Sequence, residues 1–191
     1  DLVLNIGAAG ALTSKLPIGA LITTNFSRQA DTLSILNSNK LYIDFDKNAE
    51  IQTTIKLTDS IYNILKEKYN IKKVNTLTAD FVLLDADLRD ELYNSFSQKF
   101  DSFDMETFAL ALCCQKFNTP FATLRIITDV CAAQNLDLLK HKLSKFYTLK
   151  QFAALIYNSM FATDYNKHIQ TLAAAVFDVL DTINIDIDSF K

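Results

Sequence analysis

The sequence predicts an α/β fold: a mixed, largely parallel central sheet flanked by helices on both faces, in three layers. Apolar runs of strand length alternate along the chain with segments of helical periodicity, which is the pattern of such folds. The 191 residues are 49% hydrophobic, enough for one sizeable core, while three glycines and two prolines leave little material for linkers. We therefore expect residues 1–191 to form a single domain.

The first half of the chain contains three predicted strands and one helix. Residues 2–6 form a continuous apolar run that a glycine ends, and residues 18–26 are rich in β-branched side chains. Residues 41–46 alternate apolar and polar side chains, which is typical of a short edge strand or hairpin arm. Residues 58–71 show helical periodicity, with Thr58 or Asp59 as a cap and one apolar face: Ile61, Ile64, Leu65 and Tyr69.

The second half continues the alternation and then becomes helical. A strand over residues 73–84 and a helix over 88–100 precede a helix from Asp104 to Phe117. Pro120 ends that helix, and a strand over residues 121–128 follows. The part from 135 to 191 is predicted to be helical, in three stretches: residues 136–143, 149–160 and 165–183.

Composition excludes several classes of partner. The formal net charge is -3 and the basic residues are scattered, which argues against binding to a nucleic-acid backbone. Three cysteines form an odd set without zinc spacing and favour a reduced cytoplasmic setting. No apolar run reaches the roughly 18 residues of a membrane helix. We expect a cytoplasmic protein with no nucleic-acid partner, no membrane partner, no metal and no cofactor.

The beginning of the chain reads as the interior of a fold. The stretch "DLVLNIGAAGAL" has no initiator methionine and contains a buried strand that leads into glycines. Strands of this kind usually lie inside a sheet and are preceded by other elements. We therefore expect an N-terminal portion of the fold to be absent from this sequence.

Several polar and glycine positions coincide with predicted strand ends. Ligands of open α/β sheets bind beyond the carboxyl ends of the strands. Gly7 and Gly10 form a G-x-x-G pattern, which is either a tight structural turn or a turn that lets a ligand approach the backbone. Asp80 with Phe81 and Thr128 with Asp129 fall at two further strand ends. Phe81 is either a core aromatic or a surface on which a planar base stacks.

The segment from Asp104 to Asp129 carries the other acidic candidates. Asp104 is a good helix N-cap, and Glu106 either complements the helix dipole or accepts hydrogen bonds from sugar hydroxyls. Asp129 either begins a loop or serves as a general acid if burial raises its pKa. Arg125 is either part of a buried ion pair or the orienting partner of a site carboxylate. The buried stripe of this helix is predicted to be Met105, Phe108, Ala109 and Leu112.

Three motifs resemble those of the nucleoside phosphorylase and nucleosidase superfamily, most closely the methylthioadenosine/S-adenosylhomocysteine nucleosidases. They are "DLVLNIGAAGAL", "IGALITTNFSRQAD" and "FDMETFALALCCQKFNTPFATLRIITD", with "TADFVLL" between the second and the third. They span residues 1 to about 130. The resemblance implies the three-layer fold, a homodimer and cleavage of the N-glycosidic bond of a purine nucleoside. It also places the carboxylate that activates water in the absent N-terminal portion.

The resemblance assigns roles to residues at both ends of a nucleoside. Asp129 would protonate N7 of the purine, with Thr128 beside it. Phe81 would stack on the base, and Phe103 would line the base pocket through its backbone. Four further residues would meet the sugar side: Glu106 at the ribose hydroxyls, Met105 under the sugar, and Gly7 and Ala8 facing the sugar and the nucleophile.

Two positions bear on the nucleophile. Phosphorolytic members commonly carry an arginine in the strand before the glycines, where this chain has Asn5, and Ala8 replaces a hydroxyl residue. A phosphate dianion would lack compensation for its charge there. The expected activity is therefore hydrolysis of an adenine nucleoside by water, releasing base and sugar. A phosphate-dependent purine nucleoside phosphorylase and a catalytically inert nucleoside-binding relative stay open as alternatives.

Overall fold

The computed structural model describes residues 2–30, 50–81, 83, 86–96, 99–131 and 165–182. The predicted strand over 41–46 and the predicted helices over 136–143 and 149–160 lie outside these residues. The last predicted helix, over 165–183, is confirmed as α7 (Tyr165–Thr182). No helix within the described ranges has the length and hydropathy needed to cross a membrane.

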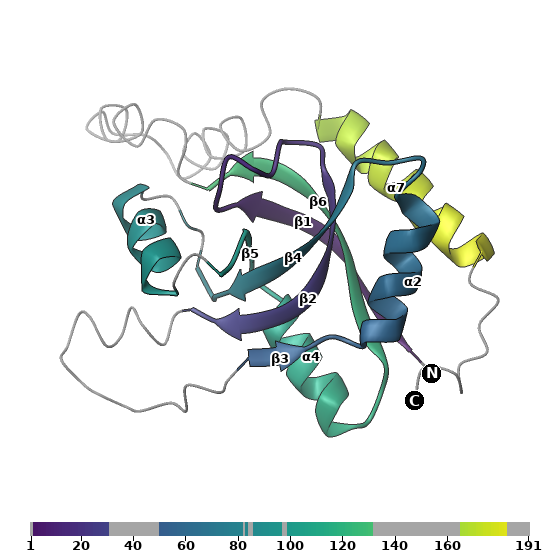
Figure 1. The fold of residues 1–191 in the computed structure, drawn as a ribbon, viewed down its shortest axis with the longest axis horizontal. Coiled ribbons are helices and arrows are strands. Elements are labelled where there is room, and N and C mark those ends of the chain that lie inside the picture. The colour runs from purple at the N-terminus through teal and green to yellow at the C-terminus, as the bar shows by residue number, and fades with distance from the viewer. Residues whose placement is uncertain are drawn as a thin grey trace, which may run out of the picture.

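The centre of the molecule is a mixed β-sheet that closes on itself (Figure 1). Its spatial order is β3-β2-β4-β5-β1-β6, and an additional pairing of β2 with β6 completes a ring. The described strands are β1 (Val3–Ala11), β2 (Leu21–Gln29), β3 (Glu50–Gln52), β4 (Ile71–Thr78), β5 (Ser102–Asp104) and β6 (Phe121–Val130).

The long pairings of the sheet are parallel. β1 pairs with β6 along its whole length, and β2 pairs with β4 in the same sense. The antiparallel pairings of β1 with β5, β2 with β3 and β2 with β6 each join only short stretches. The predicted mixed, largely parallel sheet is therefore confirmed.

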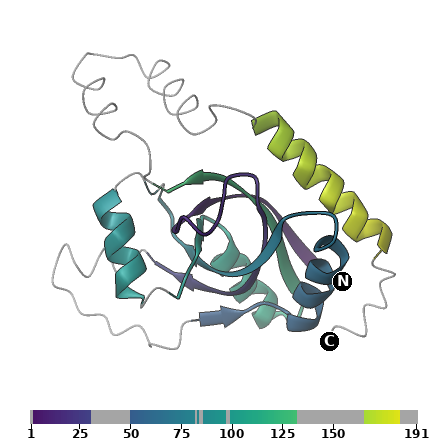
Figure 2. The same cartoon turned by 45° about the horizontal axis from the view of Figure 1, so that its top comes forward.

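Helices cover both faces of the sheet and one of its ends (Figures 1 and 2). α2 (Ile55–Leu65) and α7 lie side by side and pack against Leu124 and Ile126 of β6. α4 (Thr107–Lys116) packs through Ala111 against the opposite side of the sheet. α3 (Ala86–Ser95) lies beyond the carboxyl ends of the strands (Figure 1).

Most of the described elements begin or end at other residues than predicted, and two of these differences concern residues with a predicted role. β1 continues through both glycines to Ala11, so the predicted glycine turn is wrong; backbone pairing with β6 holds this stretch extended. α2 begins at Ile55, and Thr58 lies inside it instead of capping it. The Thr58 hydroxyl is instead 2.9 Å from that of Thr53, which ties the first turn to the preceding chain.

The predicted buried stripe of α4 is wrong for most of its members. Met105 is 43% exposed, Leu112 is 48% exposed and Ala109 is also exposed. The helix begins at Thr107, so Met105 lies outside it, and its narrow inner face has the i, i+4, i+7 spacing from Thr107. The residues buried on that face are Thr107, Ala111 and Cys114.

Candidate active site

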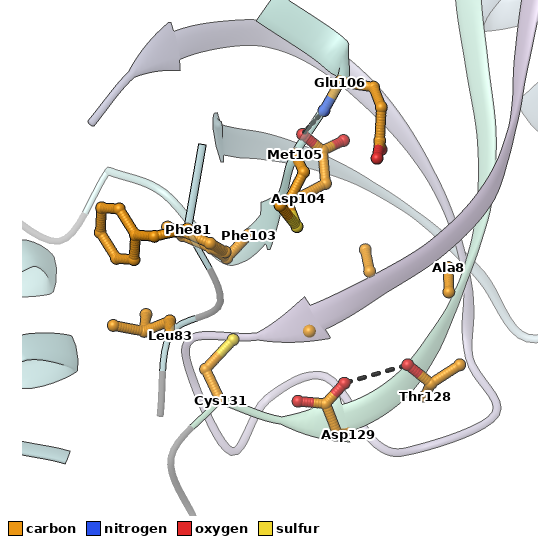
Figure 3. Close-up of a pocket in the computed structure, with 12 residues that line it drawn as sticks. Ala8, Phe81, Leu83, Phe103, Asp104, Met105, Glu106, Thr128, Asp129 and Cys131 are labelled. Atoms are coloured by element: carbon orange, nitrogen blue, oxygen red, sulfur yellow. Dashed lines mark hydrogen bonds between the residues drawn. The ribbon is translucent and has the colours of Figure 1, made fainter. Parts of the chain in front are cut away.

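A pocket of about 180 Å³ lies where β1 and β6 end beside β5 (Figure 3). Seven of the eight residues that the sequence predicted for the site line it: Ala8, Phe81, Phe103, Met105, Glu106, Thr128 and Asp129. Ligand sites of α/β proteins are expected at this end of the strands. The structure thus brings together side chains from distant parts of the chain.

Gly7 is the predicted residue that the pocket lining lacks. A Cβ atom at Gly7 would lie 3.1 Å from Nη1 of Arg125, so the missing side chain makes room for the guanidinium. Five lining residues were not assigned to the site from the sequence: Ala9, Gly10, Leu83, Asp104 and Cys131. Cys131 could have been predicted from the sequence, because side chains two residues apart in a strand point to the same side and Asp129 was already a candidate.

Asp104 fixes the start of α4 from the end of β5. Its Oδ1 accepts hydrogen bonds from Oγ1 of Thr78 at 2.7 Å and from the backbone N–H of Thr107 at 3.2 Å. Its Oδ2 accepts from the hydroxyl of Thr107. The predicted N-cap role of Asp104 is wrong, because Glu106 is the N-cap residue of α4 and Asp104 belongs to β5. From there its carboxylate still satisfies an N–H group of the first helical turn that no intrahelical carbonyl can reach.

Arg125 joins Asp104, Glu106 and β1. It is 2% exposed; its Nε lies 2.9 Å from Oδ2 of Asp104, and its Nη2 donates to Oε2 of Glu106 at 2.8 Å. Its Nη1 donates to the carbonyl oxygen of Ala8 at 2.7 Å. Both interpretations of Arg125 hold: it forms a buried ion pair and it orients a carboxylate of the pocket.

Glu106 and Asp129 lie on opposite sides of the pocket (Figure 3). The Glu106 side chain is 54% exposed, so it is open to a ligand while Arg125 holds one of its oxygens. Asp129 is more enclosed, and burial raises the pKa of its carboxyl group, against the opposing effect of a hydrogen bond from Thr128. That bond joins Oγ1 of Thr128 to Oδ1 of Asp129 at 3.0 Å.

A β-bulge aims Asp129 into the pocket. In the parallel pairing of β1 with β6, Ala9 is opposite Ile127 but Gly10 is opposite Asp129, so Thr128 is an extra residue. One inserted residue shifts the alternation of the side chains that follow it. The bulge therefore places Asp129 next to Gly10, where a Cβ atom would lie 3.2 Å from Oδ2 of Asp129.

The remaining wall of the pocket is apolar. The rings of Phe81 and Phe103 are 5.7 Å apart with an interplanar angle of 48°, and Leu83 lies beside them (Figure 3). Such a wall suits a flat aromatic ligand. The described part of the chain holds no group of His, Cys, Asp and Glu side chains suited to a metal ion. The site can therefore offer two carboxyl groups, of which Asp129 has a raised pKa, and an aromatic surface.

The curated relatives and solved structures that the chain matches include nucleosidases and a hydrolase. It is 26% identical over 130 residues to 5'-methylthioadenosine/S-adenosylhomocysteine nucleosidase of Staphylococcus haemolyticus, covering 68% of this chain and 57% of the relative. The enzyme of the same name from Halalkalibacterium halodurans is 26% identical over 137 residues, which cover 69% of this chain and 57% of that relative. The chain thus spans somewhat more than half the length of these relatives.

Solved structures share the fold at low identity. Futalosine hydrolase of Helicobacter pylori superimposes with a TM-score of 0.70 and 22% identity, over 94% of this chain and 67% of that one. S-adenosylhomocysteine nucleosidase of Streptococcus pyogenes, in complex with 5-methylthiotubericidin, superimposes with a TM-score of 0.68 and 18% identity. The match covers 96% of this chain and 69% of that one. The family model described as the phosphorylase superfamily matches residues 1–155, most of the chain. This chain therefore belongs to the phosphorylase superfamily.

Proposed function

We propose that the protein hydrolyses the N-glycosidic bond of a purine nucleoside, such as methylthioadenosine or S-adenosylhomocysteine, to a free base and a sugar. The observation that carries the proposal is the pocket with Asp129 and Glu106 on opposite sides and an aromatic wall beside them. The relatives named as nucleosidases support the same chemistry.

Asp129 acts as the general acid. As the bond between the sugar C1′ and the purine breaks, its electron pair moves onto the base, and N7 takes the carboxyl proton. The base then leaves neutral. A carboxyl group whose pKa is raised by burial keeps its proton at a higher pH and is suited to this role. Water adds to C1′ of the oxocarbenium-like sugar and releases a proton to solvent.

Glu106 holds the ribose. A carboxylate is an acceptor for two hydroxyl donors, and Arg125 fixes its orientation before the substrate binds. The buried ion pair of Arg125 with Asp104 keeps the guanidinium from moving. Met105, which is exposed in the pocket, packs under the sugar, while Phe81 and Phe103 meet the base.

Water is preferred over phosphate as the nucleophile. Among the described residues, the pocket lining includes no lysine and no arginine, and Ala8 supplies no hydroxyl there. Asn5 donates to the hydroxyl of Thr107 at 3.4 Å and carries no charge. A phosphate dianion needs cationic partners in such a site. Phosphorolysis and nucleoside binding without catalysis are the two alternatives to hydrolysis.

The protein acts as a homodimer in this proposal, through the outer face of α4. Leu110 and Phe117, seven residues apart, lie on one side of α4 and are exposed apolar side chains that the sheet does not cover. Exposed apolar surface of this kind, when contiguous, marks interaction sites on proteins. The free cysteines Cys113, Cys114 and Cys131 support the expected cytoplasmic setting.

Release of adenine from methylthioadenosine tests the reaction, measured with and without inorganic phosphate. We expect release without phosphate, and Asp129→Asn should lower kcat/KM by about 10²-fold or more, the size of a lost general acid. Asp101→Asn is the matched control, because burial also raises the pKa of Asp101 but Asp101 lies outside the pocket lining. Strict dependence on phosphate would favour a purine nucleoside phosphorylase. Binding of adenine without its release from any nucleoside would favour a catalytically inert relative.

A further inference from the structure

The thiol of Cys131 and the carboxyl group of Asp129 both lie next to Gly10, which has no side chain. A Cβ atom at Gly10 would overlap Sγ of Cys131 and would lie 3.2 Å from Oδ2 and 3.6 Å from Oδ1 of Asp129. The two side chains therefore share the space that the absent side chain of Gly10 leaves open. Figure 3 shows Cys131 and Asp129 next to one another at one side of the pocket.

The backbone of Cys131 is held from both sides. Its N–H donates to the carbonyl oxygen of Ala11 in β1 at 2.8 Å, and its carbonyl oxygen accepts from Nη1 of Arg89 in α3 at 3.1 Å. The side chain is 3% exposed and packs in an apolar cluster with Phe103 and Leu83. The thiol is thus enclosed on the side of Gly10 that the Asp129 carboxyl group also occupies.

We propose that Cys131 is a positioning residue for Asp129: its thiol fills the space beside the carboxyl group, keeps water out of it and so preserves the protonated acid. A thiol is a weak hydrogen-bond donor and acceptor, so it stabilises a carboxylate far less than water or a hydroxyl does. The effect on the carboxyl group stands by itself, whereas its consequence for catalysis rests on the proposed function.

The surroundings of Asp129 agree with exclusion of water as the main effect. Burial is the largest cause of its raised pKa, and the hydrogen bond from Thr128 opposes it. β1 contributes no ionisable side chain beside it, and α3 contributes Arg89, which is bound to the carbonyl of Cys131 and paired with Asp90. Across the pocket, Asp104 and Glu106 are paired with Arg125, and on α7 the imidazole of His168 lies against Gly19.

The test is a carboxyl titration by NMR on protein with ¹³C-labelled aspartate, with the Asp129 signal assigned by its loss in Asp129→Asn. Cys131→Ser puts a hydroxyl beside the carboxylate, so the pKa of Asp129 should fall by about one pH unit, roughly the effect of one hydrogen bond to an ionised group. Cys131→Ala, which opens the space to water, should lower it as well. Cys131→Val keeps the space filled and apolar and should leave it raised.

Cys114→Ser is the matched control, because Cys114 is also buried but lies on α4 outside the pocket lining. An unchanged titration in both Cys131→Ser and Cys131→Ala would overturn the inference, and so would a fall in Cys131→Val equal to that in Cys131→Ser. In the catalysed reaction, the alkaline limb of kcat/KM should move to lower pH in Cys131→Ser. A shifted titration in a protein that releases no base would refute the proposed function and leave this inference standing.

Discussion

Arg125 and Glu106 meet across two elements: Nη2 of the arginine, in the middle of β6, donates to Oε2 of the glutamate at the start of α4, at 2.8 Å. The same guanidinium lies against Asp104 and binds the carbonyl of Ala8. One buried cation thus sets the position of the carboxylate that we assign to the ribose. The ion pair is both part of the core and part of the pocket.

Removal of this cation should damage the fold as well as the site. Arg125→Met leaves the buried carboxylate of Asp104 without its partner, and breaking a buried pair in this way costs about 3–5 kcal/mol of unfolding free energy. Urea denaturation followed by circular dichroism measures this. Arg28→Met is the control, since Arg28 pairs with Glu50 at the longer distance of 3.8 Å and is partly exposed. Equal losses in the two variants would contradict the role of Arg125.

Glu106→Gln should weaken substrate binding while leaving the fold intact. The Glu106 side chain is 54% exposed, so replacing it with a neutral side chain buries no unpaired charge. Arg125 loses one partner but still pairs with Asp104. We expect KM to rise by about tenfold, the effect of one lost charge-assisted hydrogen bond, and the thermal midpoint to change little. Glu67→Gln, at an exposed position after α2, is the control. An unchanged KM would remove Glu106 from the sugar site.

Asp129 should reduce stability at neutral pH. Its folded-state pKa is raised, so the folded protein binds the proton more tightly than the unfolded chain does. Stability is therefore lost as pH rises from the unfolded value of about 3.8 through the folded pKa, by about 1.4 kcal/mol for each pH unit that separates the two pKa values. Asp129→Asn should then be more stable than the wild type at pH 7, with the difference shrinking toward pH 3.5. Unfolding free energies at the two pH values decide this; a less stable variant at pH 7 would contradict the raised pKa.

The outer face of α4 should control the oligomeric state. Phe117 is 72% exposed at the end of this helix, and Phe117→Glu should convert the proposed dimer into monomers. Phe177 on α7 is 65% exposed and gives a matched control, because Phe177→Glu adds the same charge on a different face. Sedimentation velocity measures the mass in solution. A dimer that survives Phe117→Glu and dissociates with Phe177→Glu would move the interface to α7.

Much of the fold could be predicted because its signals are local. Apolar runs of strand length and helical periodicity indicated β1, β2, β4, β6 and all four described helices, although the ends of several were displaced. The motifs around Gly7, Asp104 and Asp129 pointed to the superfamily, and the family model agrees. The resemblance that these motifs carry named seven residues that line the pocket.

The sequence by itself determined the alternating order of elements, since that order follows from short-range patterns, and its resemblance to the superfamily named residues that line one pocket. Only the tertiary structure decided which face of α4 is covered, because that depends on where Thr107 begins the helix against the sheet. It also decided that Arg125 links two carboxylates and that Cys131 closes over Gly10 beside Asp129. These contacts arise from the pairing of β1 with β6 and its bulge, and strand pairing is a long-range property that no local pattern encodes.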